Sequence, residues 1–126
     1  GRHLTSYVAD GLIASTATGS TAYALAAGGP ILPPELRNIL LVPIAPHLSV
    51  DRAVVLSEGS AVSILVKGEN TVLSIDGQPS ITLMDDDHVD VRAAEVTTQF
   101  VRFGDPGYFY RNLNAHMNEN SLGLPR

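Results

Sequence analysis

The sequence contains no cysteine and a single lysine, Lys67, among its 126 residues. The absence of cysteine excludes a disulfide framework, a cysteine-based metal site and a cysteine nucleophile. It also fits the reducing conditions of the cytoplasm, so we expect a cytoplasmic protein. The net charge is −5 and no basic cluster occurs. This balance argues against binding to nucleic acid or to an anionic membrane surface.

Long apolar runs are also missing from the chain. No run approaches the roughly 20 residues that a membrane-spanning helix needs, and residues 1–3 do not resemble the start of a signal peptide. The hydrophobic content of 44% is nevertheless typical of a globular protein. We therefore expect residues 1–126 to form one domain with a core of its own.

The most informative stretch is DGLIASTATGSTAYALAAGGP, which runs from Asp10 to Pro30. An apolar, strand-like run, Gly11–Ser15, follows the acid. A turn rich in hydroxyl groups comes next and leads into a run of small helix formers, Ala22–Ala27. Gly28, Gly29 and Pro30 then end that helix, as glycine and proline typically do.

This order of strand, polar turn and helix can bind a nucleotide. The first backbone N–H groups of a helix lack internal partners and carry partial positive charge, so they attract phosphate. The hydroxyls of Thr18, Ser20 and Thr21 add hydrogen-bonding groups, and Tyr23 offers a flat face to a base or ribose. The stretch is not a Walker A loop, because it has no lysine. On the residues alone, the alternative stays open that Ser20 or Thr21 only caps the helix and Asp10 is a solvated turn residue.

The rest of the chain is typical of an all-β protein. Short strands separated by Gly, Asn and Asp turns favour a multi-stranded, β-sandwich-like domain with one short helix. Asp76-Gly77 is a strong hairpin-turn signal. Pro43–His47 is expected to be a rigid loop, and a helical turn is expected within Tyr110–Met117. The expected strands are Leu4–Ala9, Gly11–Ser15, Ile39–Val42, Ala53–Leu56, Ala61–Lys67, Thr71–Ile75, Ser80–Leu83, His88–Ala93 and Val96–Phe103.

Two further features have a functional and a structural interpretation. The run Asp85–Asp87 could hold a cation, but it lacks the spacing of a calcium loop, which favours a solvated turn. His47 follows Pro46, and its position favours a role in ordering the loop over a role as a base. The four histidines show no metal-ligand spacing, so no zinc site made by the protein is expected.

The stretch from Asp10 to Pro30 resembles the signature of the NAD kinase family, D-G-[LI]-x-x-S-T-x-T-G-S-T-A-Y-x-x-[SA]-x-G-G. LVPIAPHLSVDR resembles that family's L-x-P-x-x-P-H-[ST]-L-x-x-R segment, although His47-Leu48-Ser49 inverts the order after the histidine. SIDGQ resembles its D-G-Q turn, and FGDPGYFYRNL resembles its F-Y-x-x-L close. The likeness covers about residues 5 to 113. The tail Asn114–Arg126 lacks the basic, tryptophan-containing ending of the family.

The resemblance implies the C-terminal, mostly β domain of an NAD kinase. Asp10 would hold a polar group of the dinucleotide, such as the nicotinamide amide. Thr18 and the segment from Thr21 to Ala26 would line the adenine and ribose pocket, and Ala45 would contact the dinucleotide across a subunit interface. The implied NAD-binding residues are Asp10, Thr18, Thr21, Ala22, Tyr23, Ala24, Leu25, Ala26, Ala45, Asp76 and Gln78.

The resemblance also implies a reaction: phosphate passes from ATP or polyphosphate to the 2′-hydroxyl of the adenosine ribose of NAD, with Mg²⁺ on the donor phosphates. The catalytic G-G-D-G-T motif and an N-E pair belong to an upstream Rossmann-like domain of the family, and neither occurs in these 126 residues. We therefore expect a fragment that has no catalytic residue of its own. Its expected partners are NAD, ATP or polyphosphate, its own N-terminal domain and further copies in a homodimer or homotetramer.

Two other functions stay open at this point. One is a β-sandwich binding module without catalysis, and the other is a related lipid or sphingoid-base kinase domain. The string S-T-x-T-G-S-T-A-Y is closer to the NAD kinases. The residues do not decide the phosphoryl donor, the preference between NAD and NADH, or the oligomeric state.

Overall fold

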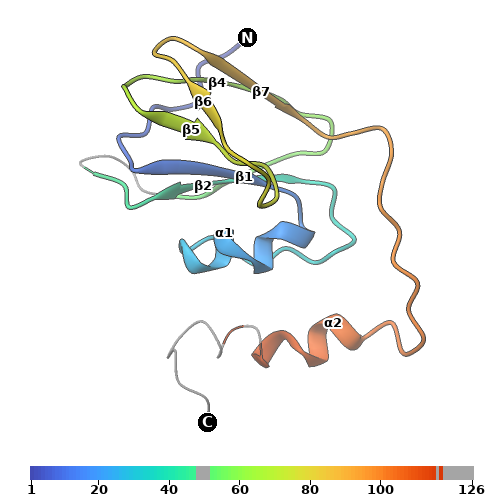
Figure 1. Ribbon diagram of the computed structural model, residues 1–126. Helices are drawn as coiled ribbons and strands as arrows, with labels where there is room; N and C mark the ends of the chain where they lie inside the picture. Colours follow the sequence, from blue (N-terminus) through green and yellow to red (C-terminus); the bar gives the residue numbers. More distant parts are fainter. Residues whose placement is uncertain (48–51, 116, 118–126) are drawn as a thin grey trace.

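The computed structural model describes residues 1–47, 52–115 and 117, and most of its regular structure is strand (Figure 1). The all-β, sandwich-like class expected from the sequence is confirmed. In chain order the elements are β1 (Gly11–Ser15), the 3-10 helix η1 (Thr18–Thr21), α1 (Tyr23–Ala26), β2 (Ile39–Ile44), β3 (Val54–Leu56), β4 (Ala61–Leu65), β5 (Thr71–Leu73), β6 (Ile81–Leu83), β7 (His88–Arg92) and α2 (Tyr108–Arg111).

The first sheet has the antiparallel order β1-β2-β3 and contains the most deeply buried strand, β2. Its register pairs Gly11 with Ile44 and Ser15 with Leu40. The buried strand expected at Ile39–Val42 is confirmed, but the expectation that Pro43–His47 is all loop is wrong for its first two residues. Strand β3 pairs with β2 only as far as Leu41, so Pro43 has one unpaired flank, where proline is tolerated in a sheet.

Two smaller sheets complete the β structure: β4 pairs with β7 and β5 pairs with β6, both antiparallel. The turn between β5 and β6 has positive φ at Asp76 (48°) and Gly77 (72°). The N–H of Gln78 donates to the carbonyl of Ile75 at 2.9 Å. This is a type I′ turn, so the hairpin predicted from Asp-Gly is confirmed.

The helical segment after β1 packs on one face of the first sheet, below it in Figure 1. The end of α1 is a Schellman motif, because Gly28 has φ 88° and the N–H of Gly29 donates to the carbonyl of Ala24 at 2.8 Å. The predicted stop is therefore confirmed, and so is the short helix, because α1 covers Tyr23–Ala26 of the expected Ala22–Ala27. A 3-10 turn comes first, and α1 is only four residues long. The shared core consists of Ala17, Ala24, Leu32, Leu40 and Val42.

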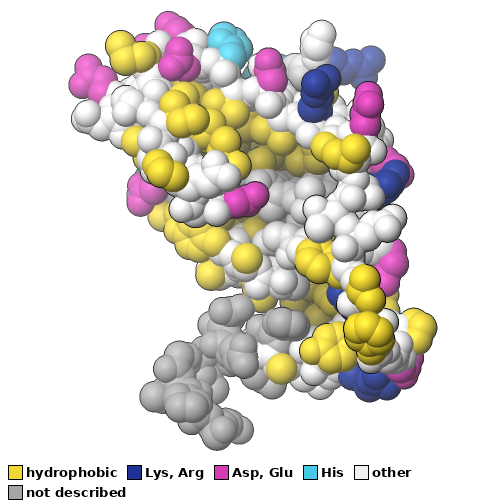
Figure 2. All heavy atoms as spheres, turned by 45° about the vertical axis from the view of Figure 1, so that its right-hand side comes forward, with side chains coloured by type: hydrophobic (Ala, Val, Ile, Leu, Met, Phe, Trp, Pro, Cys, Tyr) yellow, Lys and Arg dark blue, Asp and Glu magenta, His cyan; other side chains and the backbone are white. Residues whose placement is uncertain are grey.

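Two expected strands do not form, Leu4–Ala9 and Val96–Phe103. The first segment is held by isolated hydrogen bonds, such as that from the His47 N–H to the Val8 carbonyl at 2.6 Å. The second alternates as a strand would, yet it pairs with no strand in the described residues, and Phe103 is 99% exposed. Alternation gives a segment two faces, but a strand also needs a neighbour for its backbone groups. Figure 2 shows that apolar side chains are open on the surface of the molecule.

Helix α2 begins two residues before the helical turn expected at Tyr110–Met117, and His116 lies outside the described residues. The C-terminal tail Asn114–Arg126 lies outside them as well, except for residues 114, 115 and 117. None of the helices in the described ranges is long and apolar enough to cross a membrane.

Candidate functional site

Asp10 and His47 meet at the edge where β1 begins and β2 ends. Nε2 of His47 lies 3.0 Å from Oδ1 of Asp10, and the two side chains are 58% and 66% exposed, respectively. The backbone N–H of Asp10 donates to the carbonyl of Ile44 at 2.9 Å, which continues the pairing of the two strands. The carboxylate is therefore held close to solvent, where a ligand can reach it.

Ala45 lies in the same turn and has a φ of 44°, in the left-handed region that alanine rarely adopts. Its side chain is exposed. The unusual backbone turns the chain after β2 so that His47 comes back toward Asp10. Asp10 and Ala45 are both predicted site residues, and the hydrogen bond from the Asp10 N–H to the Ile44 carbonyl brings their segments together. Residues 48–51, which include Leu48 and Ser49 of the inverted motif, lie outside the described part of the chain.

The hydroxyl-rich turn forms η1 at the other end of β1. Thr18 is exposed, and Thr21 Oγ1 donates to the Thr18 carbonyl at 3.3 Å. A hydroxyl that donates can still accept through its lone pairs, so Thr21 keeps hydrogen-bonding capacity for a ligand. Neither Ser20 nor Thr21 caps a helix through its side chain, because Ala17 and Ala22 occupy the N-cap positions of η1 and α1. The capping interpretation is therefore wrong.

Ser20 is a structural residue rather than a free hydrogen-bonding group. It is 0% exposed, its Oγ donates to the Ala17 carbonyl at 2.6 Å, and it accepts from the Leu32 N–H at 2.9 Å. This hydroxyl ties η1 to the chain that follows α1. Ser15 Oγ, at the end of β1, is also buried but has no hydrogen-bond partner in the described structure.

Helix α1 and its N-cap Ala22 present the five predicted site positions differently. Tyr23 is 61% exposed, so its ring is open to a ligand. Ala24 is 1% exposed and packs in the core, which leaves only its backbone for any contact outside the protein. Ala22 and Ala26 are exposed, and Leu25 is half-buried. With four residues, α1 is too short for a helix-terminus phosphate site, so the hydroxyls and Tyr23 remain as the candidate binding groups.

The two groups of candidate residues lie at opposite ends of β1. Asp10 immediately precedes this strand, and η1 begins three residues after its end. A five-residue strand is about 17 Å long at the usual rise per residue. A ligand that contacts both ends must therefore be elongated and carry polar groups at each end.

Asp76 and Gln78 are exposed and lie in the type I′ turn between β5 and β6. This turn belongs to a different sheet from Asp10 and the η1 segment. The turn geometry alone explains the choice of Asp76, because aspartate tolerates positive φ better than most residues.

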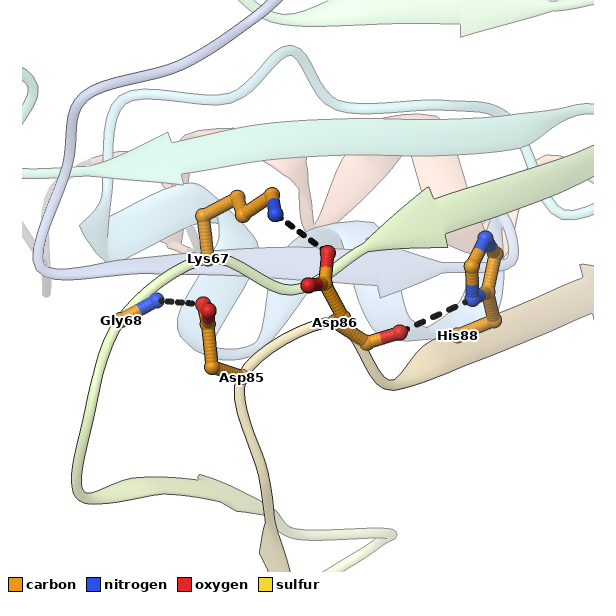
Figure 3. A network of polar contacts seen from close by, with 5 residues as sticks. All are labelled: Lys67, Gly68, Asp85, Asp86 and His88. Carbon is orange, nitrogen blue, oxygen red and sulfur yellow. Dashed lines mark hydrogen bonds and ion pairs between the residues drawn. The ribbon is translucent and has the colours of Figure 1, made fainter.

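The run of aspartates after β6 is occupied by contacts within the protein, and Figure 3 shows those with Lys67 and Gly68, which follow β4. Asp85 accepts from the Gly68 N–H at 2.8 Å, Asp86 pairs with Lys67, and Asp87 accepts from the Met84 N–H at 2.7 Å. The hydrogen bond to Asp86 raises the pKa of Lys67. In the described residues no group of three or more His, Cys, Asp or Glu side chains could hold a metal ion.

Comparison with known proteins gives consistent matches. The family model of the ATP-NAD kinase C-terminal domain matches residues 1–103. The NAD kinase of Chloroflexus aurantiacus is 43% identical over 118 residues, which are 93% of this chain and 43% of that protein. The chain thus spans less than half the length of this curated relative.

Two solved structures share the fold. The crystal structure of an NAD kinase from Archaeoglobus fulgidus in complex with ATP has a TM-score of 0.76 at 31% identity, covering 94% of this chain and 45% of that one. The crystal structure of yeast NADH kinase complexed with NADH has a TM-score of 0.68 at 38% identity, covering 72% of this chain and 27% of that one.

Proposed function

Because the chain belongs to the ATP-NAD kinase C-terminal domain family, we propose that it forms the dinucleotide-binding domain of an NAD kinase. The complete enzyme would transfer phosphate from ATP or polyphosphate to the 2′-hydroxyl of the adenosine ribose of NAD. The observation that carries this proposal is the placement of polar candidate groups at the two ends of β1. A dinucleotide is an elongated ligand with a polar group at each end.

Asp10 would accept a hydrogen bond from the nicotinamide amide, and its exposed position suits that role. Thr18, Thr21 and Tyr23 would contact the adenosine half, together with the backbone of Ala22 to Ala26. Ala45 would contact the ligand through its backbone and its methyl group. Asp76 and Gln78 would approach the dinucleotide from the β5–β6 turn.

The described residues provide no side-chain cluster for a metal ion, so Mg²⁺ would arrive on the phosphates of the donor. The base for the transfer and the cradle for the donor would come from a Rossmann-like N-terminal domain with the G-G-D-G-T motif. Reading the gene upstream of Asp10 tests this domain arrangement directly. The homo-oligomer and the cytoplasmic location stay predictions.

The binding-module and lipid-kinase alternatives are not favoured, because the relative reported above is named NAD kinase and the two solved structures reported above are an NAD kinase and an NADH kinase. The discriminating experiment is calorimetric titration of the full-length protein with NAD, NADH, nicotinamide mononucleotide and AMP. A hydrogen bond to a charged group is worth about 1.5–3 kcal/mol, so Asp10→Asn should weaken the binding of NAD by that amount.

The two ends of the site should respond separately. Asp10→Asn should weaken the binding of nicotinamide mononucleotide and leave the affinity for AMP unchanged. Thr21→Val should weaken the binding of AMP and leave the affinity for the mononucleotide unchanged. Asp90→Asn and Thr82→Val are matched controls on exposed positions of β7 and β6. Unchanged NAD affinity in both site variants would contradict the proposed site.

A further inference from the structure

His47 is held in place by the backbone before its side chain makes any contact. The left-handed φ of Ala45 and the fixed φ of Pro46 turn the chain after β2. The N–H of His47 then donates to the Val8 carbonyl at 2.6 Å, while the N–H of Asp10 donates to the Ile44 carbonyl at 2.9 Å. These two hydrogen bonds fix the two backbones against each other.

The side-chain contact uses one oxygen of the carboxylate. Nε2 of His47 lies 3.0 Å from Oδ1 of Asp10, at ordinary hydrogen-bond distance. A carboxylate has two acceptor oxygens, and no hydrogen bond to Oδ2 is found within the described ranges. The imidazole therefore fixes the plane of the carboxylate through Oδ1 and leaves Oδ2 available to a ligand.

Stability alone does not explain this pair. Both side chains are more than half exposed, and exposed ion pairs contribute little to folding. The hydrogen bonds from the His47 N–H to Val8 and from the Asp10 N–H to Ile44 join backbone atoms only, so they do not depend on the imidazole. What the imidazole adds is the orientation of a group that would otherwise rotate, and preorganising a binding group reduces the entropy lost on binding.

We propose that His47 is a positioning residue that orients the Asp10 carboxylate for the dinucleotide. This inference rests on the proposed function and adds a residue that the family resemblance does not assign. Nε2 of His47 donates to Oδ1, and Oδ2 accepts from the amide of the ligand. His47 itself need not contact the ligand.

The test uses His47→Ala and His47→Gln in the full-length enzyme. The glutamine amide can donate in place of Nε2, so His47→Gln should retain most of the affinity for NAD. His47→Ala should weaken the binding of NAD about two- to tenfold, which is the range expected for the loss of one hydrogen bond. The loss should appear in KM, with kcat unchanged, because orientation is needed equally in the ground and transition states. Arg37→Ala breaks an exposed pair with Glu58, 3.3 Å long and between two residues that are not assigned to the site, and should change neither value.

A double-mutant cycle separates positioning from direct contact. In the Asp10→Asn background, His47→Ala should have little further effect on NAD affinity. An equal loss in both backgrounds would mean that His47 contacts the ligand itself and would overturn the inference. Wild-type affinity of His47→Ala, with Asp10→Asn impaired, would overturn it too and leave the proposed function intact. If the wild-type protein binds no NAD, the proposed function fails first.

Discussion

Ser20 and Thr21 are neighbouring hydroxyl residues of one motif, yet they have different roles. Ser20 is fully buried and has two backbone partners, whereas Thr21 is half-buried and keeps accepting capacity. The sequence predicted which residue types lie in this turn, but not which hydroxyl is structural. That distinction depends on Leu32, twelve residues further along, whose position no local pattern encodes.

Replacing Ser20 with alanine should destabilise the fold. The variant leaves the Leu32 N–H without its buried partner, and an unsatisfied buried donor costs about 1–3 kcal/mol. Denaturant unfolding should show that loss in the free energy of unfolding. Ser74→Ala, at an exposed position, is the control. A Ser20→Ala variant as stable as the control would show that the hydroxyl is not needed for folding.

Tyr7 gives a prediction about pH. Burial raises the pKa of its phenol above the ordinary 10.0, and its O–H donates to the Arg52 carbonyl at 3.0 Å. The folded state therefore holds this proton more tightly than the unfolded state. The resulting stabilisation is fully present below about pH 10 and is lost as the pH rises through the folded pKa.

Spectrophotometric titration of the phenolates checks this sign. The difference between the wild-type protein and Tyr7→Phe should be one tyrosine that ionises above pH 10. The free energy of unfolding of Tyr7→Phe should also fall less steeply with alkaline pH. Tyr108→Phe, at an exposed position, is the control. If the tyrosine that is lost from the titration curve in Tyr7→Phe ionised at or below pH 10, burial would not raise the pKa of Tyr7.

At the scale of elements, the sequence correctly predicted the strands, turns and helix ends that a short stretch of residues specifies on its own. The apolar run of β2, the Asp76-Gly77 turn and the glycine stop after α1 are all present. The failures concern strand pairing: Val96–Phe103 alternates but has no neighbouring strand among the residues that the structure describes, and Pro43 is tolerated because β3 is short. Pairing is decided by the whole sheet, so single segments do not reveal it.

The packing of α1 on β2 depends on Gly29. A Cβ there would lie 2.7 Å from Cγ2 of Val42 and 2.8 Å from the carbonyl oxygen of Ala24, and the second atom is backbone. Gly29→Ala should therefore cost about 1–3 kcal/mol, as overpacking does. It should also shift α1 and weaken NAD binding through Tyr23.

Gly28→Ala is the matched comparison for Gly29→Ala. Its φ is 88°, but nothing lies within 4 Å of the added Cβ, so only backbone strain of about 1–2 kcal/mol applies. Thermal melting and NAD titration of both variants separate strain from clash. If Gly28→Ala impaired NAD binding more than Gly29→Ala, the close packing of α1 on β2 would not be what positions Tyr23.

At the scale of the molecule, the core cluster lies on the face of the first sheet that carries Leu40 and Val42, and β2 is buried on its other face as well. The fully buried apolar residues of the described chain come from β2, from the η1–α1 segment and from the loop between them. The two smaller sheets contain half-buried and exposed residues only. The core therefore lies beside the proposed dinucleotide site, and it holds β1 and α1 in place there.

Because the core lies beside the proposed dinucleotide site, we expect the 126-residue chain alone to bind NAD weakly. We also expect that it does not phosphorylate NAD. Transfer to a ribose hydroxyl needs a base within about 2.6–3.2 Å of the proton and a cradle for the donor phosphates. Of the acids assigned to the site, Asp10 is hydrogen-bonded to His47, and Asp76 lies in a type I′ turn. Lys67, in the connection between β4 and β5, is paired with Asp86 in the turn between β6 and β7.

The assay mixes the purified chain with NAD, Mg²⁺ and either ATP or polyphosphate, and it measures NADP. The full-length protein is the positive control, and a cooperative melting transition shows that the isolated chain is folded. Weak NAD binding without turnover would support a substrate-binding domain detached from its catalytic partner. Turnover at the rate of the full-length protein would mean that Asp10 or Asp76 is the base, and Asp10→Asn and Asp76→Asn would then identify which one.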